Sequence, residues 1–315
     1  MRIKTPKPMK FLYYIVSALL YVVSLFPLWL LYRLSDGLYL LLYYLIRYRR
    51  PLVRKNLTES FPEKSEAETV KIEKAFYAWF CDYIVESVKL YSIGKREMSR
   101  RMRFEGVEWV RQTVAKGQSV AVYLGHYCNW EWITSLPLAL YGDDIVCAQI
   151  YHVLENPAFD QLFLRLRNRF GAVSIPMAET IRRIFQFRNE GKKVVIGFIA
   201  DQAPFWNNIH YWTDFLRHDT PVFTGTERIA RKGDFAVYYL DVHREKRGYY
   251  VAEFKLLTEA PASLPEYGVT ELYIRALENT IRRQPQYWLW SHNRWKRTRE
   301  EWLKVVDPVT HKMRL

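Results

Sequence analysis

Residues 121–131 of the chain read AVYLGHYCNWE. An apolar run that predicts a buried strand ends at Gly125, and His126 follows at once. In open α/β sheets ligands bind beyond the carboxyl ends of strands, so this position predicts a functional site. Glu131 comes five residues after the histidine, and five residues of regular helix turn by about 140°. His126 and Glu131 can therefore face each other only if His126 lies in the turn that Gly125 permits.

A histidine beside a carboxylate is typical of general-base catalysis. A neutral imidazole accepts a hydroxyl proton at neutral pH, and a carboxylate on its other ring nitrogen fixes the tautomer and stabilises the imidazolium. Spacing alone leaves a second interpretation open, in which His126 is structural and Glu131 lies on the surface.

Short apolar runs alternate with helical patterns along the rest of the chain. Strands are predicted at residues 119–124, 145–150, 194–200, 235–241 and 251–256. Helices are predicted at residues 157–170, 178–189, 224–232 and 271–283, and a capping box of Ser65 with Glu68 opens another. This alternation predicts the α/β class, with helices flanking a central mixed sheet. Without an internal repeat or a low-complexity linker, residues 56–315 are expected to form one catalytic domain.

Residues 1–55 have the character of a membrane anchor followed by an interfacial segment. Residues 11–32 carry no charge, and as a helix they would span about 33 Å, against a hydrocarbon core of about 30 Å. Residues 38–46 are too short to span, and the cations that follow them indicate a helix at a membrane interface. We expect an N-terminal membrane-anchoring helix, although Pro27 also permits a kinked or re-entrant segment. A cleaved signal peptide and a buried globular helix fit this composition less well.

The overall charge indicates an anionic partner. Lys and Arg outnumber Asp and Glu by 47 to 33, which gives a net charge of +14 and attracts nucleic acid, acidic lipid or an acidic protein. The three cysteines are odd in number and lack CxxC spacing, so neither a disulfide framework nor a zinc site is expected.

The motif at His126 also resembles a known family. The spacing from His126 to Glu131 is similar to the His-x-x-x-x-Glu/Asp motif of glycerolipid acyltransferases, and residues 125–131 resemble its form in the bacterial late lipid A acyltransferases, the lauroyl and myristoyl transferases. Further blocks resemble this family at residues 53–63, 151–157, 167–171, 200–203, 215–225 and 288–296. The chain departs from the family at His152 and Val153, where Arg-Pro is frequent, and at residues 204–208, where a Gly-rich turn is frequent. These departures affect the expected identity of the acceptor lipid more than the expected type of reaction.

The resemblance implies transfer of a fatty acyl chain from acyl carrier protein or coenzyme A to a hydroxyl of a membrane lipid, a lipid A precursor above all. It implies no cofactor, no metal and no nucleic acid, and a place on the cytoplasmic face of the inner membrane. His126 and Glu131 are the expected catalytic residues. The expected substrate-binding residues are Asn129, Arg165, Arg169, Asp201 and Gln202; Arg169 and Arg165 would contact phosphate, and Asp201 has the alternative of capping a turn.

Two other functions stay open at this stage. One is O-acylation of a lysophospholipid or an aminolipid. The other is a non-catalytic basic protein that binds membrane or nucleic acid, because residues 286–299 interleave basic and aromatic side chains. The cations near the C-terminus equally predict a docking face for an acidic carrier protein, or for acidic lipid; they are Arg282, Arg283, Arg294, Lys296, Arg297 and Arg299.

Overall fold

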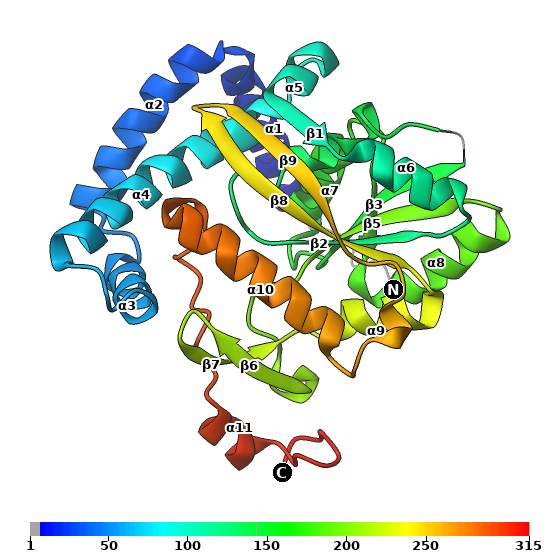
Figure 1. The fold of residues 1–315 in the computed structure, drawn as a ribbon. Helices are drawn as coiled ribbons and strands as arrows, with labels where there is room; N and C mark the ends of the chain where they lie inside the picture. The colour runs from blue at the N-terminus through cyan, green and yellow to red at the C-terminus, as the bar shows by residue number, and fades with distance from the viewer. Residues whose placement is uncertain (1–6, 143, 315) are drawn as a thin grey trace.

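The computed structural model describes residues 7–142 and 144–314 and is built around a seven-stranded sheet (Figure 1). The strand order is β1-β9-β8-β2-β5-β3-β4. These strands are β1 (Met102–Glu105), β2 (Val120–Leu124), β3 (Ile145–Tyr151), β4 (Val173–Pro176), β5 (Lys193–Ile199), β8 (Ala236–Lys246) and β9 (Tyr249–Thr258). Neighbours are parallel except β8 and β9, which form an antiparallel hairpin. The predicted mixed sheet is confirmed, and a separate hairpin joins β6 (Tyr211–Phe215) to β7 (His218–Val222).

Helices flank the sheet as predicted. They are α1 (Lys7–Leu25), α2 (Leu28–Leu40), α3 (Arg50–Ser60), α4 (Glu66–Lys89), α5 (Lys95–Arg101), α6 (Val107–Ala115), α7 (Pro157–Arg167), α8 (Thr180–Asn189), α9 (Gly225–Gly233), α10 (Gly268–Arg283) and α11 (Arg299–Val305). The capping box at Ser65 opens α4 as expected. The 3₁₀ segment Trp132–Leu138 follows the His126 turn, and the π-helical segment Leu41–Leu45 extends α2.

The two faces of the sheet pack against different helices. Successive strand residues point to opposite faces. Tyr239 on β8 donates its hydroxyl to Thr280 of α10 at 2.9 Å, whereas the hydroxyl of its neighbour Tyr238 lies 2.9 Å from that of Thr113 in α6. Figure 1 shows α10 crossing the sheet diagonally. At β8 the sheet is therefore covered by a helix on each side.

The N-terminal apolar run is not one helix. α1 ends at Leu25, and α2 begins after Pro27, which lacks an N–H and disfavours helix in the residue before it. Over the described residues no single helix is long and apolar enough to cross a bilayer; Ile15–Leu25 and Leu28–Leu45 meet that test only together, bent by 117°. The prediction of one unbroken helix over residues 11–32 is wrong, and anchoring in a membrane stays a prediction.

Helix α2 packs on α4 as part of the folded body. Leu28 and Leu31 are buried in the main core. The Ser35 hydroxyl donates to Asp82 of α4 at 2.7 Å, and the Tyr43 hydroxyl donates to Glu73 of α4 at 2.9 Å. The segment after the Pro27 break therefore packs into the folded body and also presents apolar side chains outward.

We expect Leu31→Ala to lower the free energy of unfolding by about 2–5 kcal/mol, because it removes buried methyl groups and leaves a cavity. The matched change Leu34→Ala, on the same helix but 50% exposed, should change it by less than about 0.5 kcal/mol. Denaturant titration of the detergent-solubilised protein measures both. Equal effects would contradict the packing of α2 into the core.

Candidate active site

The parallel pairing of β2 with β5 brings His126 and Asp201 together. Leu124 on β2 pairs with Ile199 on β5, and His126 and Asp201 each lie two residues beyond that pair. Between strand and histidine, Gly125 allows a close approach, because a Cβ at this position would lie 3.3 Å from the Asp201 carboxylate and 2.8 Å from Leu277. The register of the sheet and one glycine therefore place a carboxylate beside the histidine.

Asp201 holds His126 at both its ring and its backbone. Its Oδ1 lies 2.6 Å from His126 Nδ1, and its Oδ2 accepts from the His126 backbone N–H and from the Trp288 indole N–H, each at 2.8 Å. Burial on its own raises the pKa of the Asp201 carboxyl, but the His126 ring and the two N–H donors outweigh it and lower the pKa to about 2. An ionised carboxylate only accepts hydrogen bonds, so Nδ1 carries the proton and Nε2 keeps its lone pair.

The sequence led us to expect a contact between Glu131 and His126, but Glu131 contacts a different residue. It forms a two-pronged ion pair with Arg167 at the end of α7, with Nε–Oε2 2.9 Å and Nη2–Oε1 2.6 Å. The predicted contact between Glu131 and His126 is wrong because the turn after Gly125 directs the two side chains to different neighbours. The carboxylate on the imidazole is that of Asp201, which the sequence had marked as a substrate-binding residue.

Three other predicted site residues lie away from the histidine. Asn129 is fully buried, with its Nδ2 donating to Glu86 at 2.7 Å and its Oδ1 accepting from the Trp132 N–H at 3.0 Å. Arg165 and Arg169 are exposed and do not line the cleft described below; Arg169 donates instead to the carbonyl of Leu90. Residues two apart on a helix diverge, and the cleft receives Arg167, the residue between them.

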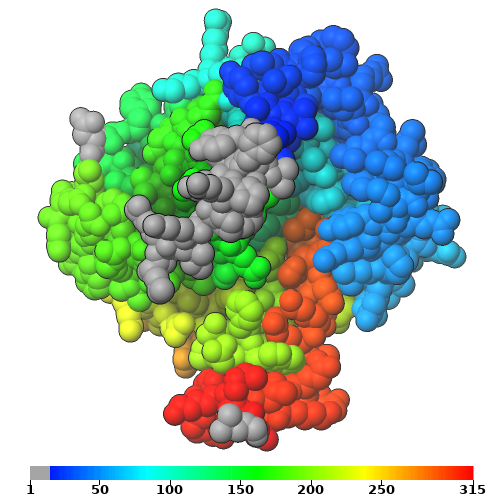
Figure 2. Space-filling view, turned by 180° about the vertical axis from the view of Figure 1, so that it is seen from behind, coloured from blue at the N-terminus to red at the C-terminus, as the bar shows by residue number. Residues whose placement is uncertain are grey.

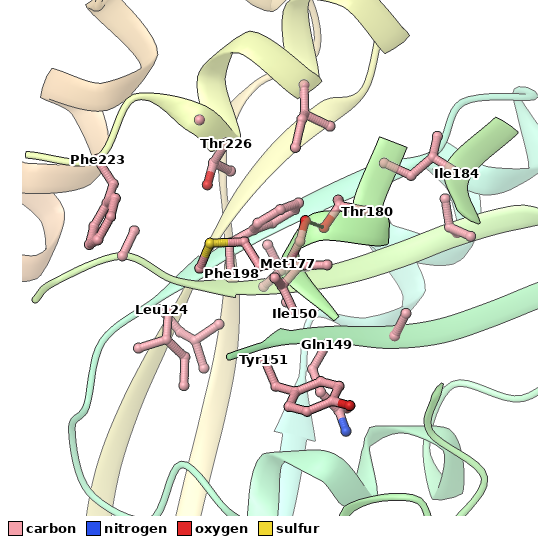
Figure 3. Close-up of a pocket in the computed structure, with 18 of the residues that line it drawn as sticks. Leu124, Gln149, Ile150, Tyr151, Met177, Thr180, Ile184, Phe198, Phe223 and Thr226 are labelled. Carbon is pink, nitrogen blue, oxygen red and sulfur yellow. Dashed lines mark hydrogen bonds between the residues drawn. The ribbon is translucent and has the colours of Figure 1, made fainter. Parts of the chain in front are cut away.

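A large cleft of about 1560 Å³ opens beside His126 and continues along the sheet. It is lined by apolar side chains of the strands and of the segments around α8 and α9 (Figure 3), among them Leu124, Ile150, Phe198, Met177, Ile184 and Phe223. The cleft also reaches Lys193, at the opposite end of β5 from Asp201. At about 3.3 Å per residue, β5 is about 20 Å long, so the cleft offers a long apolar path that begins beside His126.

Polar groups surround Nε2 of His126, the ring nitrogen that does not face Asp201. Gln202 places its amide nitrogen 3.3 Å from His126 Nε2, and a substrate-binding role for Gln202 stays a prediction. His292 lines the cleft and accepts from the Ala203 N–H at 3.4 Å; burial lowers its pKa to about 4 against the attraction of Asp201, so it is neutral at pH 7. The sequence did not reveal that Trp288 binds Asp201, because no spacing rule connects the two segments.

The cations near the C-terminus do not form one docking face. Arg282, Arg283 and Arg299 are in ion pairs with Glu278, Asp241 and Asp219. Arg294 is 1% exposed and donates to the carbonyl of Pro221. Of the six, only Lys296 and Arg297 line the cleft. Lys296 and Arg297 are therefore the two of these six cations that an anion in the cleft can meet.

The chain is similar to known proteins over most of its length. The family model described as "Bacterial lipid A biosynthesis acyltransferase" matches residues 2–297. The chain is 23% identical to the lipid A biosynthesis lauroyltransferase of Escherichia coli K12 over 297 residues, which is 93% of this chain and 94% of the relative. It is 27% identical over 124 residues to the lipid A biosynthesis myristoyltransferase of the same organism, which covers 39% of this chain and 36% of the relative. It is 21% identical to the lipid A biosynthesis acyltransferase of Haemophilus influenzae over 183 residues, 58% of this chain and 56% of the relative.

The Glu131–Arg167 pair predicts a specific pattern of stability. Arg167→Met should lower the free energy of unfolding by about 3–5 kcal/mol, because it leaves the buried carboxylate of Glu131 without its cation. Arg165→Met, an exposed change two residues away, should cost less than about 0.5 kcal/mol. Adding Glu131→Gln to Arg167→Met should recover most of the loss. Denaturant titration of the four proteins measures this, and a double variant no better than Arg167→Met would contradict the ion pair.

Proposed function

The chain belongs to the bacterial lipid A biosynthesis acyltransferase family and is an acyltransferase, and on this premise we propose that it transfers a fatty acyl chain from an acyl thioester to a hydroxyl of a lipid A precursor. The observation that carries the proposal is the His126–Asp201 pair at the entrance of a long apolar cleft. A base with a free Nε2 suits a hydroxyl nucleophile, and the cleft suits a fatty acyl chain.

In the proposed reaction His126 acts first as base and then as acid. The acceptor oxygen attacks the thioester carbonyl carbon while His126 Nε2 takes the hydroxyl proton. The imidazolium that forms is stabilised by the ionised Asp201 on Nδ1. When the tetrahedral intermediate collapses, the carbon–sulfur bond breaks and the departing thiolate takes the proton from Nε2. The ester product and the free thiol then leave, and the enzyme returns to its starting state.

The oxygen of the thioester carbonyl gains negative charge during the attack and needs hydrogen-bond donors. The amide of Gln202, close to His126 Nε2, is the donor that we assign to this role. Lys296 and Arg297, which line the cleft, add positive charge for the phosphate groups that either donor, acyl carrier protein or acyl-coenzyme A, would bring to the site.

The N-terminal helices support a membrane location for this reaction. Large apolar side chains are exposed along α1, α2 and the π-helical segment that follows, including Leu19, Trp29 and Leu45 at 60%, 68% and 77% exposure. An exposed apolar surface of this extent is typical of a membrane interface. Figure 2 shows these blue helices on the same side of the molecule as the green segment of α7 and α8. We propose that the bent pair holds the enzyme on the cytoplasmic face of the inner membrane, where its lipid acceptor lies.

The test is acyl transfer by purified wild type and His126→Ala. Both donors should be offered with a lipid A precursor, a lysophospholipid and an aminolipid as acceptors, and the products weighed by mass spectrometry. We expect wild type to add one acyl chain to the lipid A precursor, and His126→Ala to lose at least about 10²–10⁴-fold in kcat. His243→Ala, which changes a histidine away from the cleft, should stay within about twofold.

Two outcomes would contradict the proposal. Transfer to a lysophospholipid or aminolipid in preference to the lipid A precursor would keep the chemistry but change the acceptor. Activity of His126→Ala within about tenfold of wild type would remove the general base itself.

A further inference from the structure

Glu86, on the face of α4 that packs against the sheet, binds three parts of the chain at once. Its side chain is fully buried. Oε1 accepts from the Tyr32 hydroxyl of α2 at 2.9 Å, and Oε2 accepts from the Tyr250 hydroxyl of β9 at 2.8 Å. Oε2 also accepts from the Asn129 amide at 2.7 Å. None of these contacts takes part in the proposed chemistry, yet Asn129 lies three residues from the histidine base.

The turn that carries His126 needs support from outside itself. Cys128 has a φ of 51°, in the left-handed region that is costly for a residue with a Cβ. Asn129 follows, and its side chain is held at both ends, by Glu86 and by the Trp132 N–H. Trp132 in turn donates its indole N–H to the backbone carbonyl of Glu86 at 3.0 Å. Glu86 therefore holds both sides of the strained turn.

The same helix fixes the ring that contacts the imidazole. Trp130 packs edge-on against His126, with ring centroids 5.1 Å apart. Behind it, Tyr83 of α4 stacks on Trp130 at 4.0 Å. Because Tyr83 and Glu86 are three residues apart on one helix, a shift of the Asn129 contact would move Trp130 across Tyr83 and change the surroundings of His126.

The hydrogen-bond chemistry explains why an acceptor is required opposite Asn129. A tyrosine hydroxyl can donate or accept, but the amide nitrogen of Asn129 can only donate. Its oxygen is already used by the Trp132 N–H. Leaving that buried amide nitrogen without an acceptor would cost about 1–3 kcal/mol, and the strained turn is the part of this region that can relax to avoid the cost.

We infer that Glu86 is a positioning residue, which sets the orientation of His126 through Asn129. The inference rests on the proposed acyl transfer for its kinetic test, but not for its spectroscopic test. Because Glu86 also binds Tyr32 of α2, the helix proposed to meet the membrane and the turn that carries the base share one buried carboxylate.

Exchanging the donor and the acceptor between Asn129 and Glu86 provides the experiment. Asn129→Asp sets two carboxylates against each other, and we expect kcat to fall at least tenfold with KM for the donor within twofold. In the double variant Glu86→Gln plus Asn129→Asp, the glutamine amide donates to the aspartate, so kcat should return to within threefold of wild type. Tyr32→Phe removes a different donor from the same carboxylate and should lower the melting temperature while leaving kcat within threefold.

The pH dependence of kcat in Asn129→Asp distinguishes the positioning role from a general loss of stability, which would not produce the same pH dependence. Burial and the neighbouring charge of Asp82 raise the pKa of Glu86 to about 7, so a facing carboxylate would readily share a proton with it. The ratio of variant to wild-type kcat should therefore be higher at pH 6 than at pH 8. A ratio that does not change with pH would count against the inference.

A second measurement separates this inference from the proposed function. In protein with ¹⁵N-labelled histidine, the His126 Nδ1–H proton, bound to a carboxylate at 2.6 Å, should give a downfield resonance. Asn129→Asp should shift it and the double variant should restore it, even if wild type transfers no acyl chain to any acceptor offered. A double variant that folds but restores neither kcat nor the resonance would overturn the inference, as would a folded Asn129→Asp protein that matches wild type in both. If Asn129→Asp alone does not fold, the double variant decides by the same two readouts.

Discussion

A single buried carboxylate organises this active site. Asp201 accepts hydrogen bonds from the His126 ring, from the His126 backbone and from Trp288, which joins the ends of β2 and β5 to the C-terminal segment. A charge that is 2% exposed is tolerated only where donors converge on it. The donors that stabilise the charge are the same ones that fix the imidazole, so folding of this region and orientation of the base are one event.

The sequence predicted the sheet because its signals are local. Apolar runs mark β2, β3, β5, β8 and β9, while the short edge strands β1 and β4 are too brief to stand out. It also placed His126 at a strand end. It paired the histidine with the wrong carboxylate, because Glu131 is near in sequence whereas the approach of Asp201 depends on the register of β2 against β5. The sequence also predicted Arg165 and Arg169, rather than Arg167, as site residues. The face that α7 presents to the cleft is set by tertiary packing, which the sequence pattern does not report.

The N-terminal region serves both the membrane proposal and the folded core. The Pro27 break turns α2 back across α4, so that one side of α2 packs in the core and the other exposes apolar residues. Ser35 binds Asp82, and Arg247 at the β8–β9 turn bridges Asp82 and Asp36. The helices proposed to meet lipid are thus tied through α4 to the sheet that carries the His126–Asp201 pair. A sequence pattern reports the apolar length of such a segment but not this division between its two sides.

Asp201, rather than Glu131, is the carboxylate that contacts the His126 imidazole. The most direct measurement compares kcat for Asp201→Asn and Glu131→Gln at saturating donor. An asparagine keeps the shape of the side chain, but its N–H can face the ring and favour the wrong tautomer, so Asp201→Asn should lose about 10³–10⁴-fold. Glu131→Gln, which weakens an ion pair away from the imidazole, should lose less than about tenfold. A larger loss of kcat in Glu131→Gln than in Asp201→Asn would contradict the pairing of His126 with Asp201.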